Sequence, residues 1–236
     1  MLIENETVKA IFISRPNRFQ AYIALNGEEI MVHVPNTGRC TEILKKGSTV
    51  ILEEKNGTQR KTKYDLICGY KGDKIINIDS QIPNKVVYEA LLNRRIEKLT
   101  RYSKIEKEKT YRDSRFDFLL SNENEKYYLE VKGVTLEDNG YALFPDAPTV
   151  RGTKHLLGLI SAKKQGLGAG ILFLHQMDGI KGFSPNSKMD RDFTNALIEC
   201  KNQGVDIFAY SCKLSENFIE LKDKIQIDLG GMEIDL

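Results

Sequence analysis

No run of 18 apolar residues occurs in this 236-residue chain, which excludes an ordinary membrane-spanning helix. The N-terminal segment, Met1 to Glu6, has neither a basic start nor an apolar stretch, so we expect no secretory signal peptide. The sequence holds four widely separated cysteines: Cys40, Cys68, Cys200 and Cys212. No Cys-x-x-Cys pair or Cys/His cluster suggests zinc, and such thiols are typical of a reduced, cytoplasmic protein.

Charge is nearly balanced overall but unevenly distributed. The net charge is only +2, and it predicts nothing about nucleic acid by itself. Residues 45–74 hold eight Lys and Arg against four Asp and Glu, residues 85–116 hold ten against five, and residues 213–236 hold three against six. Basic segments followed by an acidic end are compatible with a phosphate-binding face. The alternative is a set of ordinary solvated loops and helix faces.

The first 80 residues are rich in strand signals. Short apolar or alternating runs occupy Val8–Ile13, Phe19–Leu25, Glu29–Val34, Thr49–Glu54, Tyr64–Cys68 and Lys74–Ile78. Asn26-Gly27, Asn56-Gly57 and Gly72-Asp73 are tight-turn pairs between these runs. This spacing predicts a small antiparallel barrel over residues 1–82, with an OB-like barrel as first choice and an SH3-like barrel as second. Both kinds of barrel bind varied ligands, so the fold alone does not define the function.

From about residue 83 the pattern changes to mixed helices and strands. Apolar spacing predicts three helices, over Lys85–Leu99, Thr149–Lys164 and Asp190–Lys201. Strand signals lie around Ile105 and over Phe116–Leu120, Tyr127–Val131, Ala169–His175 and Val205–Tyr210. The order αβββαβαβ predicts an α/β domain over residues 83–236, with a mixed sheet flanked by helices and parallel pairing at its C-terminal end. The first six elements match the core order of the PD-(D/E)xK nuclease fold.

Two of these strands carry acids within apolar runs. The polar segment Asn122–Glu125 separates them, so they are predicted to form a β-hairpin. Alternate side chains of a strand share a face, so Glu130 and Lys132 point the same way, and Asp117 can reach that face from the partner strand. Two carboxylates and an ammonium on one sheet face are costly unless they bind something. A divalent cation with a phosphate fits this set.

The Asp…Glu-x-Lys arrangement resembles the PD-(D/E)xK nuclease motif. That resemblance implies that Asp117 and Glu130 hold Mg²⁺, or Mn²⁺, and that Lys132 polarises the attacking water or stabilises the phosphorane charge. On the preceding helix, Glu89 is a candidate further metal ligand, directly or through water, and Glu108 is its rival. The alternative is a solvated hairpin with ordinary surface charges.

The predicted helix that begins near Thr149 brings cations to its first turns. Arg151, Lys154 and His155 are spaced to share one face, and a phosphate fits a cationic patch at a helix N-terminus. His155 could also transfer protons or be a packed structural histidine. Just before the helix, Asp146 could either complete the acidic cluster or cap the helix.

Further basic residues lie in the barrel and beside the hairpin acid. Arg15, Arg18 and Arg39 could contact the nucleic-acid backbone through bidentate phosphate bonds, or the cluster could dock the two domains. Arg115, two residues before Asp117, is assigned to the same nucleic-acid-binding set. The strand aromatics Phe19, Tyr22 and Tyr64 are expected to stack on bases or to pack in the core.

Several long motifs, in order along the chain, resemble the sugar fermentation stimulation protein A (SfsA) family. They span residues 15–19 (RPNRF), 33–39 (HVPNTGR), 114–118 (SRFDF), 128–136 (YLEVKGVTL) and 144–156 (FPDAPTVRGTKHL). The resemblance implies an N-terminal OB-like domain, a nuclease-like C-terminal domain and DNA binding. It also implies, through the family name, a role in the regulation of sugar (maltose) metabolism genes.

We therefore expect a cytoplasmic protein that binds DNA, single- or double-stranded, mainly through backbone phosphates. The first hypothesis is a Mg²⁺-dependent endo- or exonuclease with Asp117, Glu130 and Lys132 as catalytic residues. The second is a regulator that keeps the nuclease frame as a catalytically silent DNA clamp. The third is a sugar- or nucleotide-binding module that uses the barrel.

Overall fold

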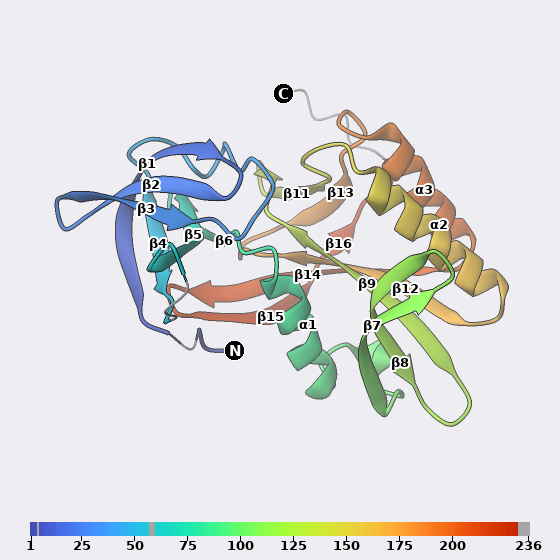
Figure 1. The fold of residues 1–236 in the computed structure, drawn as a ribbon. Helices are drawn as coiled ribbons and strands as arrows, with labels where there is room; N and C mark the ends of the chain where they lie inside the picture. The colour runs from blue at the N-terminus through green and yellow to red at the C-terminus, as the bar shows by residue number, and fades with distance from the viewer. Residues whose placement is uncertain (4, 57–59, 231–236) are drawn as a thin grey trace.

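A five-stranded barrel, extended by a sixth strand, and an α/β domain pack side by side in the computed structural model, which describes residues 1–3, 5–56 and 60–230 (Figure 1). None of the helices in these ranges is long and apolar enough to cross a membrane.

The barrel is built from the predicted N-terminal strands. They are β1 (Thr7–Asn17), β2 (Gln20–Leu25), β3 (Glu28–His33), β4 (Thr49–Glu54), β5 (Tyr64–Lys71) and β6 (Lys74–Asn77). The sheet order is β3-β2-β1-β4-β5-β6, and a further β3–β5 pairing at His33 and Asp65 closes it. Asn26 and Gly27 both have positive φ, the conformation that a two-residue hairpin turn requires. The Asn56-Gly57 turn lies partly outside the described residues.

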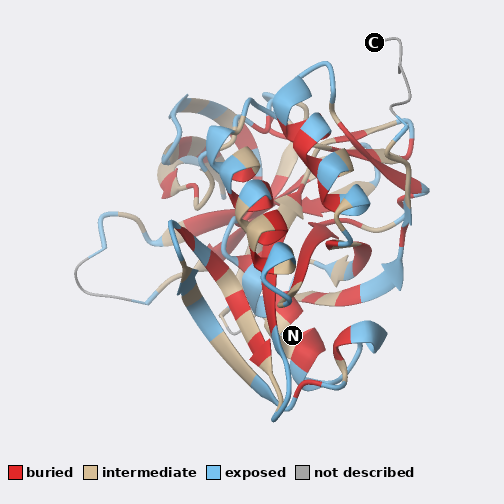
Figure 2. Cartoon of the chain, turned by 90° about the vertical axis from the view of Figure 1, so that its right-hand side faces the viewer, coloured by how far each residue is buried: buried red, intermediate tan, exposed pale blue. Residues whose placement is uncertain are grey.

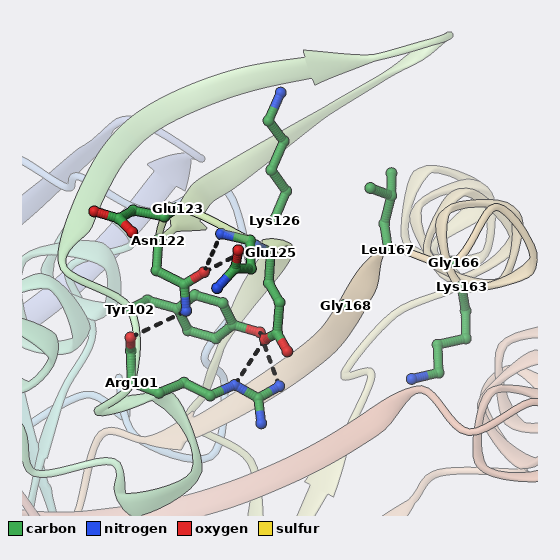
Figure 3. A pocket seen from close by; sticks show the side chains of 11 residues that line it. Arg101, Tyr102, Asn122, Glu123, Glu125, Lys126, Lys163, Gly166, Leu167 and Gly168 are labelled. Carbon is green, nitrogen blue, oxygen red and sulfur yellow. Dashed lines mark hydrogen bonds and ion pairs between the residues drawn. The ribbon is translucent and has the colours of Figure 1, made fainter.

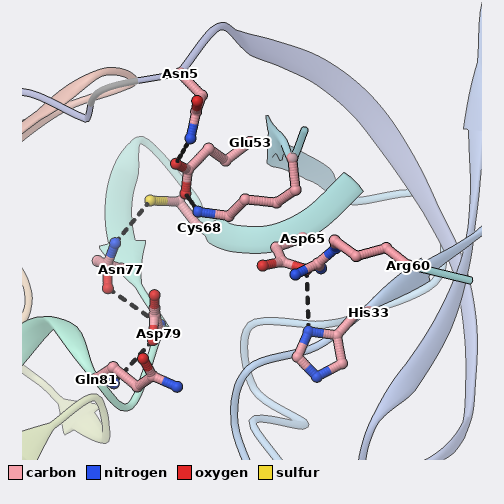
Figure 4. Close-up of polar contacts among 10 residues, drawn as sticks. Asn5, His33, Glu53, Arg60, Asp65, Cys68, Asn77, Asp79 and Gln81 are labelled. Carbon is pink, nitrogen blue, oxygen red and sulfur yellow. Dashed lines mark hydrogen bonds and ion pairs between the residues drawn. The ribbon is translucent and has the colours of Figure 1, made fainter. Parts of the chain in front are cut away.

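A polar cluster reinforces the closing pair of the barrel. His33 Nδ1 lies 3.0 Å from Asp65 Oδ1, and Arg60 contacts the same carboxylate oxygen (Figure 4). Figure 4 also shows Asp79 after β6, where its Oδ1 accepts a hydrogen bond of 2.8 Å from the Gln81 backbone N–H. These bonds order the chain as it leaves the barrel for the second domain.

The second domain is centred on a six-stranded sheet with the order β15-β14-β12-β9-β8-β7. Its strands are β7 (Lys104–Tyr111), β8 (Ser114–Ser121), β9 (Lys126–Val134), β12 (Gly168–His175), β14 (Asp206–Ser215) and β15 (Phe218–Lys224). β12 pairs in parallel with both β9 and β14, which confirms the predicted parallel pairing. β8 and β9 form the predicted antiparallel hairpin.

Helices cover both faces of this sheet. They are α1 (Ile82–Leu92), α2 (Val150–Lys164) and α3 (Arg191–Asn202), with a 3₁₀ turn η1 over Glu97–Leu99. The first differs from its prediction because Pro83 fits the first helical turn and Arg94, with φ of 54°, ends the helix before η1 begins. α1 packs on one face, and α2 and α3 pack on the other.

A second, four-stranded sheet was not predicted from the sequence. It contains β10 (Glu137–Asp138), β11 (Tyr141–Phe144), β13 (Gly182–Pro185) and β16 (Gln226–Ile227), in the order β10-β11-β13-β16. Strands of two to four residues carry too little alternation to be recognised by pattern. The strand β15 was also missed.

One hydrophobic cluster continues from the barrel into the α/β domain. It joins Phe12 and Val32 of the barrel to Phe116, Leu156 and Phe173 around α2. A second cluster lies under α1. Figure 2 shows the buried positions along the strands and on the inward sides of the helices, with exposed residues outside. The two domains therefore share part of their core.

Glu137 adds a buried ionic contact across the domain junction. Its carboxylate lies 2.9 Å from Lys71 Nζ and 3.0 Å from Lys74 Nζ, and both lysines belong to the barrel. The Gly140 N–H donates a third bond of 2.7 Å. Burial raises the pKa of Glu137, but these donors outweigh it and lower the pKa to about 2.

We predict that Glu137→Gln destabilises the protein by about 1–3 kcal/mol, because it leaves two lysines facing an uncharged amide. Urea unfolding followed by circular dichroism measures the change. The control is Glu216→Gln, which removes an exposed ion pair with Lys9 (2.6 Å) across the same junction and should cost at most about 1 kcal/mol. Equal losses in the two variants would contradict the role given to Glu137.

His175, at the end of β12, is a fully buried polar group. Neither ring nitrogen has a hydrogen-bond partner within the described part of the chain, and the ring packs 5.4 Å from that of Phe183. Burial lowers the pKa of His175 from 6.5 to about 3. The ring therefore stays neutral in the folded protein, whereas it gains a proton below its ordinary pKa when the chain unfolds.

This difference predicts that acid destabilises the fold through His175. The unfolded chain binds a proton at His175 near pH 6.5, whereas the folded chain binds it only near pH 3. Stability is therefore unaffected at neutral pH and falls as the pH drops from about 6.5 toward 3. The loss attributable to His175 should reach about 2 kcal/mol between pH 7 and pH 5. His175→Leu should lose correspondingly less stability than the wild type in chemical denaturation at these two pH values. Parallel losses in the two proteins would exclude this effect.

Candidate active site

Asp117 lies where the ladder between β8 and β9 ends. The pairing runs from Ser121 and Lys126 to Phe118 and Leu129 and does not continue to Asp117. Beyond this ladder, the Asp117 side chain rather than the backbone bonds to β9: its Oδ2 accepts a hydrogen bond of 2.7 Å from the Val131 N–H. Asp117 Oδ1 accepts another of 2.7 Å from Asn84 Nδ2 on α1. The carboxylate is thereby directed toward the middle of β9.

Glu130, at the middle of β9, is 2% exposed. Its Oε1 accepts a hydrogen bond of 2.5 Å from Lys132 Nζ and lies 2.5 Å from His155 Nδ1. The other oxygen, Oε2, is buried and has no hydrogen-bond partner among the described residues. The contact with Lys132 confirms that the two side chains share a face of the strand.

The two carboxylates influence each other. Burial raises the pKa of Asp117 above its ordinary value, and the negative charge of Glu130 raises it further. Burial also acts to raise the pKa of Glu130, but the His155 hydrogen bond and the charge of Lys132 outweigh it, so the pKa is lowered. The pKa values of the two acids are therefore displaced in opposite directions. The bond from the Val131 N–H places the Asp117 carboxylate against the residue that follows Glu130.

The start of α2 positions His155 against Glu130. Thr149 caps the helix, because its hydroxyl accepts a hydrogen bond of 3.1 Å from the Gly152 N–H, and Asp190 accepts one of 2.7 Å from the Thr149 N–H. The capping role considered for Asp146 therefore belongs to Thr149. One turn later, Arg151 Nε lies 3.5 Å from His155 Nε2. Both ring nitrogens of His155 thus face protein groups, so the structure does not support its assignment as a direct phosphate contact.

Other acids proposed for the metal site lie apart from this pair. The Glu89 carboxylate is 2.9 Å from the Met1 amino group, so it has a partner outside this pair, and its role as a metal ligand stays a prediction. Glu108 is exposed and lies 3.6 Å from Arg115. The residue of α1 that reaches the site is Asn84, which the sequence analysis missed. Its only signal is its position in the first turn of that helix, directly after Pro83.

The basic residues of the barrel divide into two groups. Arg15 donates to four backbone carbonyls, those of Arg18, Asn36, Gly38 and Arg39, at 2.6–2.9 Å. Its predicted role in phosphate binding is therefore wrong, and it instead holds the loop in place. In contrast, Arg18 and Arg39 are exposed, and their side chains have no bonding partner within the described ranges.

The basic residues of α2 also separate. Arg151 is exposed and contacts His155. Lys154 lines a cavity together with Tyr111 and Gly158. The role of Arg151 and Lys154 in phosphate binding stays a prediction.

A cavity of about 450 Å³ opens beside Asp117. It is lined by Ser80, Gln81, Asn84, Lys85, Lys107, Glu108, Asp117 and Phe118. Lys85 and Lys107 line this space together with the acids Glu108 and Asp117, and the Lys107 ammonium lies 3.6 Å from the centre of the Tyr88 ring. The two lysines are the groups of this cavity that can attract an anionic ligand.

Another cavity, of about 440 Å³, lies between the β8–β9 turn and the C-terminal end of α2 (Figure 3). Arg101 Nε lies 3.0 Å from Glu125 Oε2, and the Tyr102 hydroxyl is 3.2 Å from the same oxygen. This cavity begins at Lys126, whereas Glu130 lies further along β9. Its lining includes none of Asp117, Glu130 and Lys132, so it is separate from the candidate active site.

Both parts of the chain match described domains. Residues 13–78 match the SfsA N-terminal OB domain, and residues 81–218 match the sugar fermentation stimulation protein RE domain. Sugar fermentation stimulation protein homologs of Clostridium botulinum (strain Langeland) and Clostridium tetani (strain Massachusetts) are each 60% identical over 230 residues, which is 97% of this chain and 100% of either relative.

A solved structure has a similar overall fold. The structure of Pyrococcus furiosus SfsA in complex with Ca²⁺ has a TM-score of 0.87 and 27% identity, covering 97% of this chain and 99% of that chain. These similarities confirm an OB-type barrel followed by an α/β domain with mixed sheets. The chain belongs to the sugar fermentation stimulation protein (SfsA) family.

Proposed function

We propose that the protein is a divalent-metal-dependent nuclease that hydrolyses phosphodiester bonds of DNA at Asp117, Glu130 and Lys132. The observation that carries this proposal is the unpartnered, buried Oε2 of Glu130. A carboxylate oxygen without a donor is costly in the protein interior, and a cation removes that cost.

The residues present fit a hard divalent cation. Asp117 and Glu130 offer carboxylate oxygens, the ligands that Mg²⁺ and Mn²⁺ favour. The described residues contain no cluster of three or more acidic, His or Cys side chains that could hold a metal. A two-carboxylate set agrees with Mg²⁺, which keeps several waters and binds through one or two carboxylates plus substrate phosphates. The P. furiosus SfsA structure is a complex with Ca²⁺, which supports a divalent-cation site in this family.

Each side chain has a distinct part in hydrolysis. The bound cation would supply Lewis-acid polarisation of the phosphate and lower the pKa of a water molecule. Lys132 Nζ lies 2.5 Å from Glu130 Oε1, where it can stabilise the charge that develops on the phosphorane. His155 and Asn84 are positioning residues, because each bonds one carboxylate and limits its rotation. Lys85 and Lys107 attract the phosphate backbone into the cavity beside Asp117.

The OB-type barrel supports DNA as the polymer, and backbone contact of this kind gives a non-specific Kd of about 10⁻⁴–10⁻⁶ M at physiological salt. Regulation of sugar metabolism genes rests on the family name. A catalytically silent DNA clamp is the competing function, and it would bind DNA without cutting it.

We predict that Asp117→Asn and Lys132→Ala each reduce metal-dependent cleavage at least about 100-fold, because each removes a group that acts on the transition state. Purified protein is incubated with labelled single- or double-stranded DNA in Mg²⁺, Mn²⁺ or EDTA, and products are resolved on gels. Glu123→Gln, which neutralises an exposed carboxylate in the β8–β9 turn, is the matched control and should cut normally. Retention of DNA by the wild type without cutting in any metal would favour the clamp.

The second prediction for this site concerns metal binding alone. Glu130→Gln should weaken Mn²⁺ binding at least about tenfold, since an uncharged amide is a poorer ligand for a hard cation. Isothermal titration calorimetry or Mn²⁺ electron paramagnetic resonance measures this without a nucleic acid. Unchanged affinity in Glu130→Gln, with Glu123→Gln as control, would refute the proposed ligand role.

A further inference from the structure

A cavity at the junction of the two domains has the features of a nucleotide-binding pocket. It has a volume of about 560 Å³ and is lined by Phe12, Arg15, Asn17, Arg18, Thr37, Gly38, Arg39, Thr41, Leu44 and Ala147. All of these residues belong to the barrel except Ala147, which lies just before α2. The cavity therefore lies between the barrel and the segment that leads to the candidate active site.

The lining combines two kinds of surface. Phe12 and Leu44, at 4% and 8% exposure, contribute apolar atoms. Arg18 and Arg39 contribute guanidinium groups that have no bonding partner in the part of the chain that the structure describes. An apolar surface accepts a base, and a guanidinium binds a phosphate through two parallel hydrogen bonds.

The rim of this cavity is already ordered. The four bonds from Arg15 to the carbonyls of the surrounding loops hold residues 36–39 in one conformation. Asn36 adds a bond of 2.6 Å from its amide nitrogen to the Ile78 carbonyl. A preorganised rim loses little conformational freedom when a ligand binds.

We propose that this pocket holds one unstacked nucleotide of a single-stranded nucleic acid, with its base against Phe12 and Leu44 and its phosphates on Arg18 and Arg39. The inference rests on the proposed nuclease function and specifies its substrate class. A base inside a duplex is stacked and paired, so it cannot enter such a cavity without being extruded. Phe19, which follows Arg18 and is 51% exposed, offers a surface for stacking a neighbouring base.

The pocket lies near enough to the acids to serve the same strand. α2 begins at Val150, three residues after Ala147, and His155 on this helix contacts Glu130. A helix rises about 1.5 Å per residue, so Val150 and His155 are roughly 7.5 Å apart along its axis. A short length of single strand can therefore extend from the pocket to the site of hydrolysis.

Fluorescence anisotropy in EDTA, with fluorescein-labelled oligo(dU), oligo(U) and a blunt DNA duplex, tests the pocket without cleavage. The wild type should bind a single strand more tightly than the duplex, and the preferred oligonucleotide identifies the sugar. Arg18→Ala and Arg39→Ala should each weaken that binding about tenfold. Thr41→Phe, which fills the cavity without removing a charge, should weaken it by a similar factor.

The control is Lys201→Ala, which removes an exposed charge near the end of α3 and should have no effect. Thermal unfolding of each variant checks that the fold is intact. Unchanged single-strand binding in Thr41→Phe, or equal affinity for strand and duplex, would overturn the pocket. If the wild type cuts DNA while these variants bind normally, only the pocket fails. If they lose binding but the wild type never cuts, only the nuclease proposal fails.

Discussion

The compensated charge of Glu130 is the interaction on which the candidate site depends. A carboxylate that is 2% exposed is costly to bury unless nearby groups neutralise it. Here both compensating contacts, from Lys132 and His155, converge on one oxygen and leave the other without a partner among the described residues. The fold thus stabilises the ionised form and still leaves a ligand atom available. This arrangement requires β9 and α2 to keep a fixed position relative to each other. The shared core around Leu156 and Phe173 holds them in that position.

The charge balance also assigns different parts to the two acids. Hydrogen bonding by His155 and the charge of Lys132 lower the pKa of Glu130, whereas burial and the charge of Glu130 raise the pKa of Asp117. Two adjacent carboxylates with pKa values displaced in opposite directions are less repulsive than two equal charges. A divalent cation between them would favour ionisation of both.

The central part of the site was predictable because it depends on local rules. Strand alternation placed Glu130 and Lys132 on one face, and the predicted hairpin formed next to Asp117, whose side chain accepts a bond from the Val131 N–H. Residues that depend on tertiary packing were not predictable. Glu89 and Asn84 lie on the same helix, and only the docking of α1 on the sheet decides which of them reaches Asp117. Arg15 was misassigned because its acceptors are backbone carbonyls, which leave no trace in the sequence.

The fold also was predictable where it depends on local sequence patterns and not where it depends on tertiary packing. The barrel strands and the βαβ arrangement emerged from periodicity and turn pairs, since those elements are long enough to show a pattern. The four-stranded sheet has strands of two to four residues, and its existence depends on partners far away in the chain. The end of α1 is set by the left-handed backbone of Arg94, a conformation that an arginine in the sequence does not indicate.

The continuous hydrophobic cluster between the barrel and the α/β domain has a mechanical consequence. Phe12 of this cluster also lines the junction cavity, and Phe116, another member, packs with its ring centre 5.9 Å from that of His155. A hinge motion between the domains would separate the side chains of this cluster and expose their apolar surface to water. The shared core therefore holds the two domains in a fixed arrangement. A flexible polymer that contacts both domains must bend to follow their surfaces.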